Sequence, residues 1–382
     1  MTLSGSVQDP AQGGLESVAA PERVGSLTGI RALAALLVVL THAAYTTGKY
    51  PQGYLGLVWS RAEIGVPIFF VLSGFLLFRP WVKAAATGAP APSVRRYAWH
   101  RVRRIMPAYV VTVLIAYLVY HFRTAGPNPG HTWEGLFRNL TLTQIYADNY
   151  LYSFLHQGLT QMWSLAVEAA FYVVLPLLAY VLLVLLCRRR WRPGLLMTGL
   201  VVAAAVSPVW LVIVHHHGAD LPDGARLWLP TYLAWFVAGM MLAVLGQLKV
   251  RGYAMVCVPL ALVCYFIAST PIAGEPTTSP AKLSEALFKT AFYAVIAALL
   301  VAPPALGDRG WYTRFLASRP MVFLGEISYE IFLIHLIIME LVMVEILQSP
   351  VYTGSMFNLF VLTMAFTIPA SWLLHRFTRV RS

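Results

Sequence analysis

The sequence predicts an all-α integral membrane protein of about ten transmembrane helices, with both the N-terminus and the C-terminus in the cytoplasm. Hydrophobic residues make up 58% of the 382 residues and charged residues only 12%, whereas soluble domains carry about a quarter charged residues. Apolar runs also recur along the chain, and a spanning helix needs about 20 apolar residues. The runs cover residues 28–47, 62–82, 107–122, 163–187, 195–215, 229–248, 253–270, 285–306, 321–347 and 356–377.

Two of the segments outside these runs carry expectations of their own. The run at 107–122 is short, and we expect its helix to extend into the basic segment before it. The connection 123–162 is long for a loop without a role. We expect it to contain a short interfacial helix around residues 133–139.

The basic residues fix the expected orientation. Most of the 28 Lys and Arg residues fall in the connections that a cytoplasmic N-terminus would place inside, as the positive-inside rule requires. The net charge of +12 therefore indicates contact with membrane lipid and no binding of nucleic acid. We expect a disordered cytoplasmic tail at 1–26, a transmembrane domain at 27–378 and a basic cytoplasmic tail at 379–382.

The first apolar run contains two ionisable residues, Arg31 and His42, and such residues are costly inside a bilayer. Eleven residues at 100° per residue bring both onto one helix face, with a rise of roughly 16 Å between them. This geometry suits a long anionic ligand that enters from the cytoplasm, with its charged end at Arg31 and its reactive end near His42. The alternative is that Arg31 only anchors the helix end and His42 bonds a neighbouring helix.

Two further segments place charged side chains at helix ends. Arg101 and Arg104 stand three residues apart before the third run, so they share a face and could hold phosphates together; the alternative is a cluster that contacts anionic lipid. Glu168, in the segment that opens Trp163-Ser164, is expected near the depth of His42. A carboxylate beside an imidazole would orient it and raise its basicity; the alternative is a helix-packing hydrogen bond.

The remaining polar candidates lie in other runs. Tyr329, Glu330 and His335 are in the ninth run and are expected to line the same cavity as His42. Ser73, Trp163 and Ser164 are further candidates for the cavity wall. The alternative for Ser73 and its neighbour Gly74, in the second run, is close helix packing, which small residues favour. The three cysteines fall inside apolar runs without metal-type spacing, and His215–His217 has no partner at set spacing, so no metal site is predicted.

Together these segments resemble the integral membrane acyltransferase family 3. Arg31, ten residues and His42 match its first-helix motif, and Arg101-Val102-Arg103-Arg104 matches its Arg-x-x-Arg motif. Three further blocks match in order: GVPIFFVLSGFLL, MWSLAVEAAFYVVLPLL and FLGEISYEIFLIHL. The resemblance runs from about residue 27 to 377 and indicates the stand-alone form, without a C-terminal esterase-like domain. Thr28 and Pro67 stand where the family often has Asp, which indicates a subgroup.

The resemblance implies an acyl-CoA-dependent O-acyltransferase of the bacterial plasma membrane. The donor would be acetyl-CoA or another short acyl-CoA, used as a substrate and not as a resident cofactor. The acceptor would be a hydroxyl on a sugar, a glycolipid, a cell-envelope glycan or a glycosylated metabolite. Arg31, Arg101 and Arg104 would hold the coenzyme A phosphates, His42 would be the general base or an acyl relay, and Glu168 would orient His42.

A secondary transporter is the alternative from another class, because intramembrane His42 and Glu168 could also relay protons. Transporters of this size usually contain two similar halves, and the sequence shows no such repeat. Acyl chain length, the identity of the acceptor and its side of entry, direct or relayed transfer, and the oligomeric state are left open by the sequence.

Overall fold

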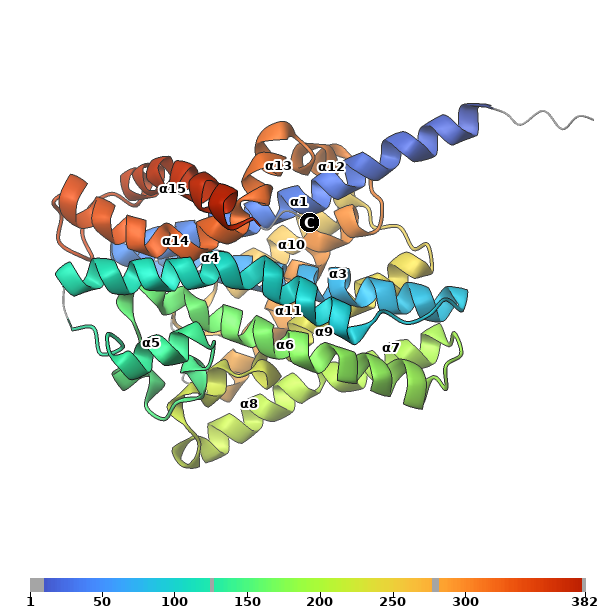
Figure 1. Cartoon of the computed structure of the whole chain (residues 1–382), viewed down its shortest axis with the longest axis horizontal. Helices are drawn as coiled ribbons and strands as arrows, with labels where there is room; N and C mark the ends of the chain where they lie inside the picture. Colours follow the sequence, from blue (N-terminus) through green and yellow to red (C-terminus); the bar gives the residue numbers. More distant parts are fainter. Residues whose placement is uncertain (1–9, 124–126, 277–281, 380–382) are drawn as a thin grey trace, which may run out of the picture.

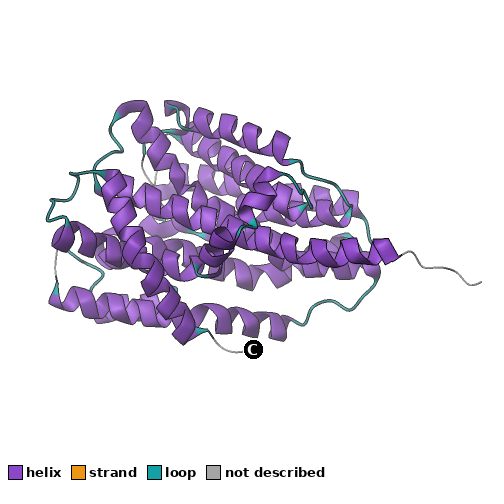
Figure 2. Cartoon of the chain, turned by 90° about the horizontal axis from the view of Figure 1, so that it is seen from above, coloured by secondary structure: helices purple, strands orange, loops and turns teal. Residues whose placement is uncertain are grey.

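A computed structural model of the chain describes residues 10–123, 127–276 and 282–379, and these residues form helices and loops without a strand (Figure 2). The α-helices are α1 (Pro10–Thr46), α2 (Gly53–Ser60), α3 (Gly65–Thr87), α4 (Val94–Phe122), α5 (Trp133–Leu140), α6 (Trp163–Ala179), α7 (Pro193–Ala204), α8 (Val206–His217), α9 (Leu229–Gln247), α10 (Ala254–Ala268), α11 (Leu283–Ala305), α12 (Trp311–Leu316), α13 (Arg319–Glu326), α14 (Ser328–Leu341) and α15 (Met356–Thr378). Single helical turns join several of them, including η1 (Arg61–Ile64), η4 (Gln157–Met162), η7 (Asp223–Leu227) and η9 (Val342–Ile346).

Eight of the described helical segments are long and apolar enough to cross a membrane, and a ninth is the bent pair formed by α13 and α14. The remaining predicted span, 253–270, corresponds to α10, whose 15 residues reach only about 22 Å at 1.5 Å per residue. The all-α membrane fold is confirmed. Helix α4 extends into the basic segment, and α5 lies where the interfacial helix is predicted.

The ninth predicted span, 321–347, is not one straight helix. It bends by 71° between Glu326 and Ser328. At the bend α13 crosses α1 so closely that a Cβ on Gly325 would lie 2.1 Å from the carbonyl oxygen of Thr28. The Ser328 hydroxyl donates to the Gly325 carbonyl at 2.8 Å, which satisfies one group freed by the bend.

The centre of the molecule is the packing of α3 on α9. A Cβ on Gly74 would lie 2.0 Å from the carbonyl of Phe236, and one on Gly239 would lie 1.8 Å from the carbonyl of Val71. Each helix therefore presents a glycine to the other's backbone, the close approach that small residues allow between membrane helices. The packing predicted for Gly74 is confirmed.

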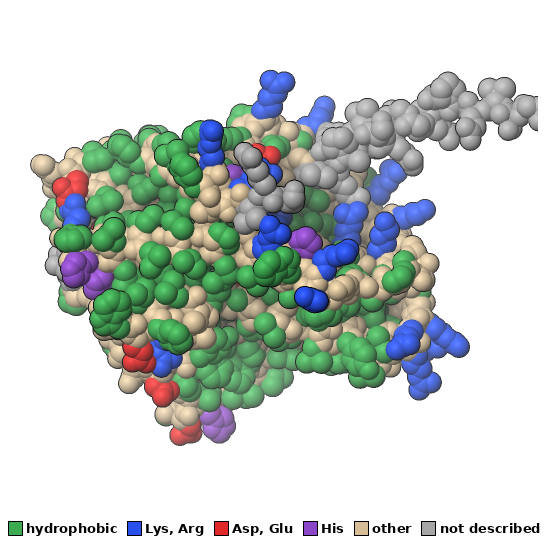
Figure 3. Space-filling view, viewed as in Figure 1, with side chains coloured by type: hydrophobic (Ala, Val, Ile, Leu, Met, Phe, Trp, Pro, Cys, Tyr) green, Lys and Arg blue, Asp and Glu red, His purple; other side chains and the backbone are tan. Residues whose placement is uncertain are grey.

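The helices define two faces (Figure 1). On one face, which we call the terminal face, Thr378 and Arg379 from the end of the described chain line the same cavity as Thr28 and Arg31 of α1. The loop face is the opposite one, where α1 ends and α3 begins. Figure 3 shows Lys and Arg side chains gathered over the terminal face, as the positive-inside pattern predicts.

The predicted cytoplasmic position of the termini and the predicted division of the chain stay predictions. Helix α1 begins at Pro10, inside the segment predicted as a disordered tail at 1–26. Residues 1–9 and 380–382 lie outside the described part of the chain.

On the loop face, the connection after α4 is fastened to the bundle. Tyr109 and Tyr117 of α4 donate to the carbonyls of Asn139 and Gly130, at 2.7 Å and 2.6 Å. His156 is buried and stacks on Tyr117 with ring centroids 4.5 Å apart. Burial lowers the pKa of His156 to about 3. The connection is therefore a packed element built around a neutral imidazole.

Candidate active site

A cavity of about 780 Å³ opens at the terminal face between α1, α3, α4, α6, α14 and α15. We call it the basic cavity, because Arg31, Arg101 and Arg104 all line it. The structure thus brings together the three arginines that the sequence singles out. Other predicted site residues on its wall are Ser73, Ser164, Glu168, Tyr329 and Glu330.

Two of the three arginines, Arg101 and Arg104, belong to α4, which begins at an N-cap. The Ser93 side chain accepts from the backbone N–H of Arg96 at 3.4 Å and caps the helix. Arg101 and Arg104, eight and eleven residues after Ser93, both line the cavity. The Nε atom of Arg101 is buried and has no hydrogen-bond partner among the described residues. A buried donor without a partner is costly, so this group favours an anionic ligand.

Glu168 lies in the same cavity and accepts a hydrogen bond from the Ser73 hydroxyl of α3. No hydrogen bond joins Glu168 to His42 among the described residues, so the predicted contact between this carboxylate and the imidazole is not found. Depth along two helix axes can be estimated from sequence, but the direction in which each side chain points across the bundle cannot. The carboxylate instead contributes a negative charge opposite Arg31.

His42 is paired with a second imidazole, His335 of α14. The Nε2 atom of His335 lies 3.1 Å from Nδ1 of His42, and the ring centroids are 5.0 Å apart. The Nδ1 atom of His335 faces the carbonyls of Phe332 and Ile331 at 2.8 Å and 3.1 Å. The sequence placed both histidines in one cavity without pairing them, because they are 293 residues apart.

These contacts determine which nitrogen of each ring carries the proton. Carbonyl oxygens only accept, so Nδ1 of His335 carries its single N–H and its Nε2 accepts. The Nδ1 atom of His42 then faces two acceptors, His335 Nε2 and the Val38 carbonyl at 2.8 Å, and must carry the proton. Nε2 of His42 is left with its lone pair, which is the form needed by a base or a nucleophile.

Phe332 lies between the basic cavity and the histidine pair. Its ring lines the cavity, packs on Phe69 at 6.2 Å and lies 6.0 Å from His335. His335 itself is fully buried, whereas His42 is half-buried. Neither histidine is part of the wall of the basic cavity, which Phe332 connects to His335.

The remaining predicted residues lie around this arrangement. Tyr329 donates to the carbonyl of Ile105 at 3.0 Å, and Ser164 donates to the carbonyl of Gln161 at 3.1 Å. Glu330 is buried and bonds His375 Nδ1 at 2.9 Å. Trp163 lines a second cavity, of about 470 Å³, at the loop face.

Sequence reasoning missed other members of the basic cavity wall, namely His100, Tyr172, His375 and Arg379. His100 precedes Arg101 and could have been found from that spacing, whereas His375 and Arg379 come from α15 and its end, far along the chain. Within the described residues, no group of three or more His, Cys, Asp or Glu side chains could hold a metal ion.

The fold and the cavity define a class, a multi-pass membrane protein whose interior offers cations to an anionic ligand and an imidazole pair beyond them. Comparison with known families agrees. The family described as "Acyltransferase domain" (acyltransferase family 3) matches residues 24–376, and the chain belongs to it. It is therefore a membrane-embedded enzyme that transfers acyl groups, and the transporter alternative is not favoured.

Similar proteins are acyltransferases from bacteria. The chain is 28% identical to the acyltransferase MdmB of Streptomyces mycarofaciens over 83% of this chain and 79% of that one. It is 26% identical to the peptidoglycan O-acetyltransferase OatA of Listeria monocytogenes, over 86% of this chain and 52% of that one. It is 21% identical to the O-acetyltransferase OatA of Staphylococcus aureus, over 84% and 51%. The chain thus spans about half the length of the latter two, and no solved structure matches.

Proposed function

We propose that the protein transfers an acetyl or another short acyl group from acyl-CoA to a hydroxyl of a sugar-containing acceptor, such as a glycolipid or a cell-envelope glycan. The names of the relatives support O-acetyl transfer, and one of them names peptidoglycan. The single observation that carries the proposal is the basic cavity, whose wall contains the buried Nε of Arg101, without a partner among the described residues, and which Phe332 connects to the His42–His335 pair.

The donor would enter at the terminal face. Coenzyme A carries several phosphate charges, and arginine pairs hold phosphates through parallel charge-assisted hydrogen bonds. Arg101 and Arg104 would take these phosphates, with Arg31 of α1 beside them. The pantetheine arm would then run along the apolar wall that includes Phe69 and Leu72, toward Phe332 and His42.

The chemistry would occur at Nε2 of His42. In direct transfer, Nε2 takes the proton from the acceptor hydroxyl as its oxygen bonds to the thioester carbon; the C–S bond then breaks, and the coenzyme A thiolate receives the proton. In relayed transfer, Nε2 attacks the thioester carbon and the C–S bond breaks, releasing the coenzyme A thiolate. The acceptor hydroxyl then bonds to the acyl carbon, the bond from that carbon to Nε2 breaks, and the hydroxyl proton passes through the freed Nε2 to the thiolate. General base catalysis of this kind contributes about 10²–10⁴-fold in rate. In both routes His335 positions His42 by holding its Nδ1–H.

Glu168 would act from the cavity wall and not through the His42 ring. Its bond with Ser73 fixes the carboxylate beside the path of the donor, where it balances Arg31. Ser164, Tyr329 and Glu330 would complete the wall that surrounds the bound arm.

The experiment is release of free coenzyme A from a panel of acyl-CoA donors by the purified chain, measured by mass spectrometry. Wild type is compared with His42→Ala and Arg101→Ala. The proposal predicts release by wild type, loss of release in His42→Ala with donor binding retained, and weakened donor binding in Arg101→Ala. If no donor binds to wild type, or if all three proteins behave alike, the proposal is wrong.

A further inference from the structure

The cavity at the loop face, of about 470 Å³, is lined by the beginnings of α3, α6, α9 and α11, by the end of α8 and by η1 and η7. We call it the outer cavity. It adjoins the basic cavity: Val66 of α3 lines both, and at the start of α6 Trp163 lines the outer cavity while Ser164 and Leu165 line the basic one. The two cavities therefore approach each other at the starts of α3 and α6.

The outer cavity also lies close to His42. Thr41, the neighbour of His42 in α1, donates to the carbonyl of Ser60 at 3.0 Å, and Ser60 directly precedes η1, which contains Glu63. Glu63 lies within Coulombic range of His42 and lines the outer cavity. The outer cavity is thus adjacent to the segment of the bundle that packs against α1 beside His42.

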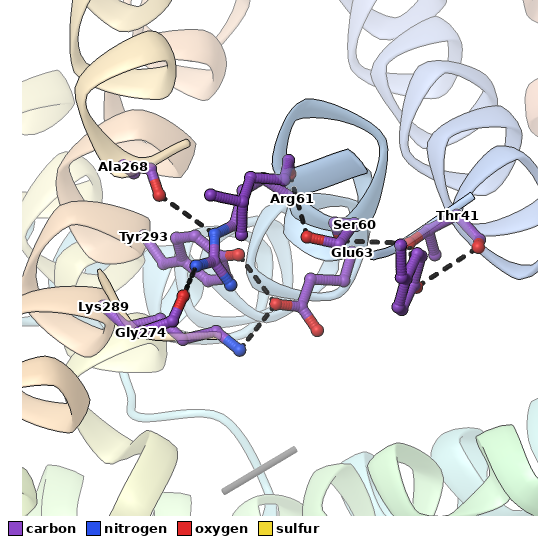
Figure 4. A network of polar contacts seen from close by, with 10 residues as sticks. Thr41, Ser60, Arg61, Glu63, Ala268, Gly274, Lys289 and Tyr293 are labelled. Carbon is purple, nitrogen blue, oxygen red and sulfur yellow. Dashed lines mark hydrogen bonds and ion pairs between the residues drawn. The ribbon is translucent and has the colours of Figure 1, made fainter. Parts of the chain in front are cut away.

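A charged cluster on one wall is built and held in place. The Glu63 carboxylate receives Lys289 Nζ at 2.6 Å and the Tyr293 hydroxyl at 2.7 Å, both from α11 (Figure 4). Arg61, two residues earlier, bonds instead to the carbonyls of Ala268 and Gly274. Both of these contacts fall on Oε1 of Glu63, so Oε2 is the carboxylate atom left for a ligand in the cavity.

Two polar groups in the wall lack partners. Thr231 is 5% exposed, and its Oγ1 has no hydrogen-bond partner among the described residues. The same holds for Nε of Arg226, and both residues line the outer cavity. Buried polar groups are normally satisfied, so an acceptor and donor pair left open in one cavity points to a polar, uncharged or weakly charged ligand.

Another part of the wall is apolar and consists of four aromatic side chains in a row. Ring centroids are 5.1 Å apart for Trp163 and Tyr232, 4.8 Å for Tyr232 and Trp235, and 6.1 Å for Trp235 and Tyr293. All four line the outer cavity. A ligand that matches this wall has a flat apolar face and a rim of hydrogen-bonding groups, as a pyranose ring has with its C–H face and its hydroxyls.

We propose that the outer cavity binds the pyranose ring of the acceptor. The aromatic wall would receive its C–H face, and Thr231, Arg226 and Glu63 Oε2 would bind its hydroxyls. One further hydroxyl would then point toward His42. This inference rests on the proposed function, which makes the bound sugar the acceptor of the acyl group. Binding of the sugar to the cavity does not require a donor.

The test uses the full chain in nanodiscs of synthetic phospholipid, free of sugar detergents. Methyl β-D-glucopyranoside and methyl N-acetyl-β-D-glucosaminide are titrated while tryptophan fluorescence is recorded, with sorbitol as an open-chain control that lacks a ring face. We expect a saturable change with a glycoside, no saturation with sorbitol, and loss of most of the change in Trp163→Phe. His42→Ala should bind the glycoside like wild type.

A matched pair of variants tests the wall itself. Thr231→Val and Thr363→Val make the same substitution at buried hydroxyls without partners, but Thr363 is in α15 and lines none of these cavities. We expect Thr231→Val to raise the dissociation constant about tenfold, as loss of a buried hydrogen bond does, and Thr363→Val to leave it unchanged. Equal effects, or no saturable response in wild type, would overturn the proposal.

Coenzyme A release on the same samples separates the two ideas. Release by wild type without any glycoside response would remove the sugar site and keep the acyl-CoA donor. A glycoside response that Thr231→Val weakens, in a chain that binds no acyl-CoA, would keep the sugar site and remove the donor.

Discussion

The basic cavity and the outer cavity differ in how they treat charge. Several arginines line the basic cavity together with Glu168, Glu326 and Glu330, and the Nε of Arg101 is buried without a partner among the described residues. In the outer cavity Glu63 is already matched by Lys289, and aromatic rings form the wall. The first is arranged for a ligand that brings negative charge, and the second for a ligand that brings hydroxyls and an apolar face.

The difference also indicates that the donor and the acceptor bind in different cavities, one at each face of the bundle. Both cavities touch the start of α3 and the start of α6, and His42 lies near this region because its neighbour Thr41 bonds to Ser60, just before η1. A charged donor and a sugar acceptor can then be recognised by separate chemistries and still meet at one imidazole. The predictions below test whether the residues of each region act on only one substrate.

The largest effect is expected at the point shared by both regions. His42→Ala removes the base or relay, so we expect turnover to fall by about 10²–10⁴-fold while binding of donor and of sugar persists. Turnover is measured as coenzyme A release under saturating donor. His216→Ala, at the exposed end of α8, serves as the control. Unchanged turnover in His42→Ala would show that the imidazole is not the reacting group.

The arginines should affect the donor alone. Arg101→Ala combined with Arg104→Ala is expected to raise KM for acyl-CoA by about 100-fold or more, since each charge-assisted contact contributes about 1.5–3 kcal/mol. The matched control is Arg95→Ala with Arg96→Ala, which removes the same charge from the exposed start of α4 outside the cavity. Equal changes in both double variants would reduce the role of the pair to general surface charge.

His335 should affect the rate and not the binding of either substrate. Its Nε2 holds the Nδ1–H of His42, and loss of such an orienting group costs about 10–100-fold in activity. We expect kcat to fall in His335→Leu with both KM values kept, and His335→Gln, which retains an acceptor, to recover part of it. A fall in thermal stability without this split between kcat and KM would indicate that His335 only packs.

The smallest effect belongs to the loop face and depends on pH. Burial lowers the pKa of His156 to about 3, below the ordinary value near 6.5. The folded connection therefore keeps this ring neutral, and its stabilisation is complete above pH 6.5. It is lost as pH falls from 6.5 toward about 3, at up to about 1.4 kcal/mol per pH unit.

Hydrogen exchange of residues 127–156, corrected for the intrinsic pH dependence, measures this effect between pH 7.5 and 5. Protection should fall in wild type and change less in His156→Phe, which keeps a ring against Tyr117. The amides of α11 serve as the internal control. Equal loss of protection in wild type and variant would contradict the assignment to His156.

The sequence predicted the fold well because span position depends on local composition. The runs of apolar residues locate the membrane helices, the extension of α4 and the helix α5. The bend between α13 and α14 escaped prediction, since it depends on the approach of Gly325 to the Thr28 backbone in another helix.

The sequence predicted several residues of the site but not which side chains contact one another. Arg31, Arg101 and Arg104 share a cavity as their helix positions suggest. His42 was expected beside Glu168 but contacts His335, because periodicity gives the face of one helix and not its neighbours in the bundle. The outer cavity escaped prediction altogether, since its wall comes from five α-helices and the segments between them.

The most direct test of the central claim uses proteoliposomes sorted by orientation, with labelled acetyl-CoA on one side and a methyl glycoside on the other. We expect coenzyme A release and labelled sugar only when the donor is at the terminal face and the glycoside at the loop face, and neither product in His42→Ala. Transfer with the two substrates exchanged, transfer by His42→Ala, or no transfer in either arrangement would contradict acyl transfer at His42 between two cavities on opposite faces.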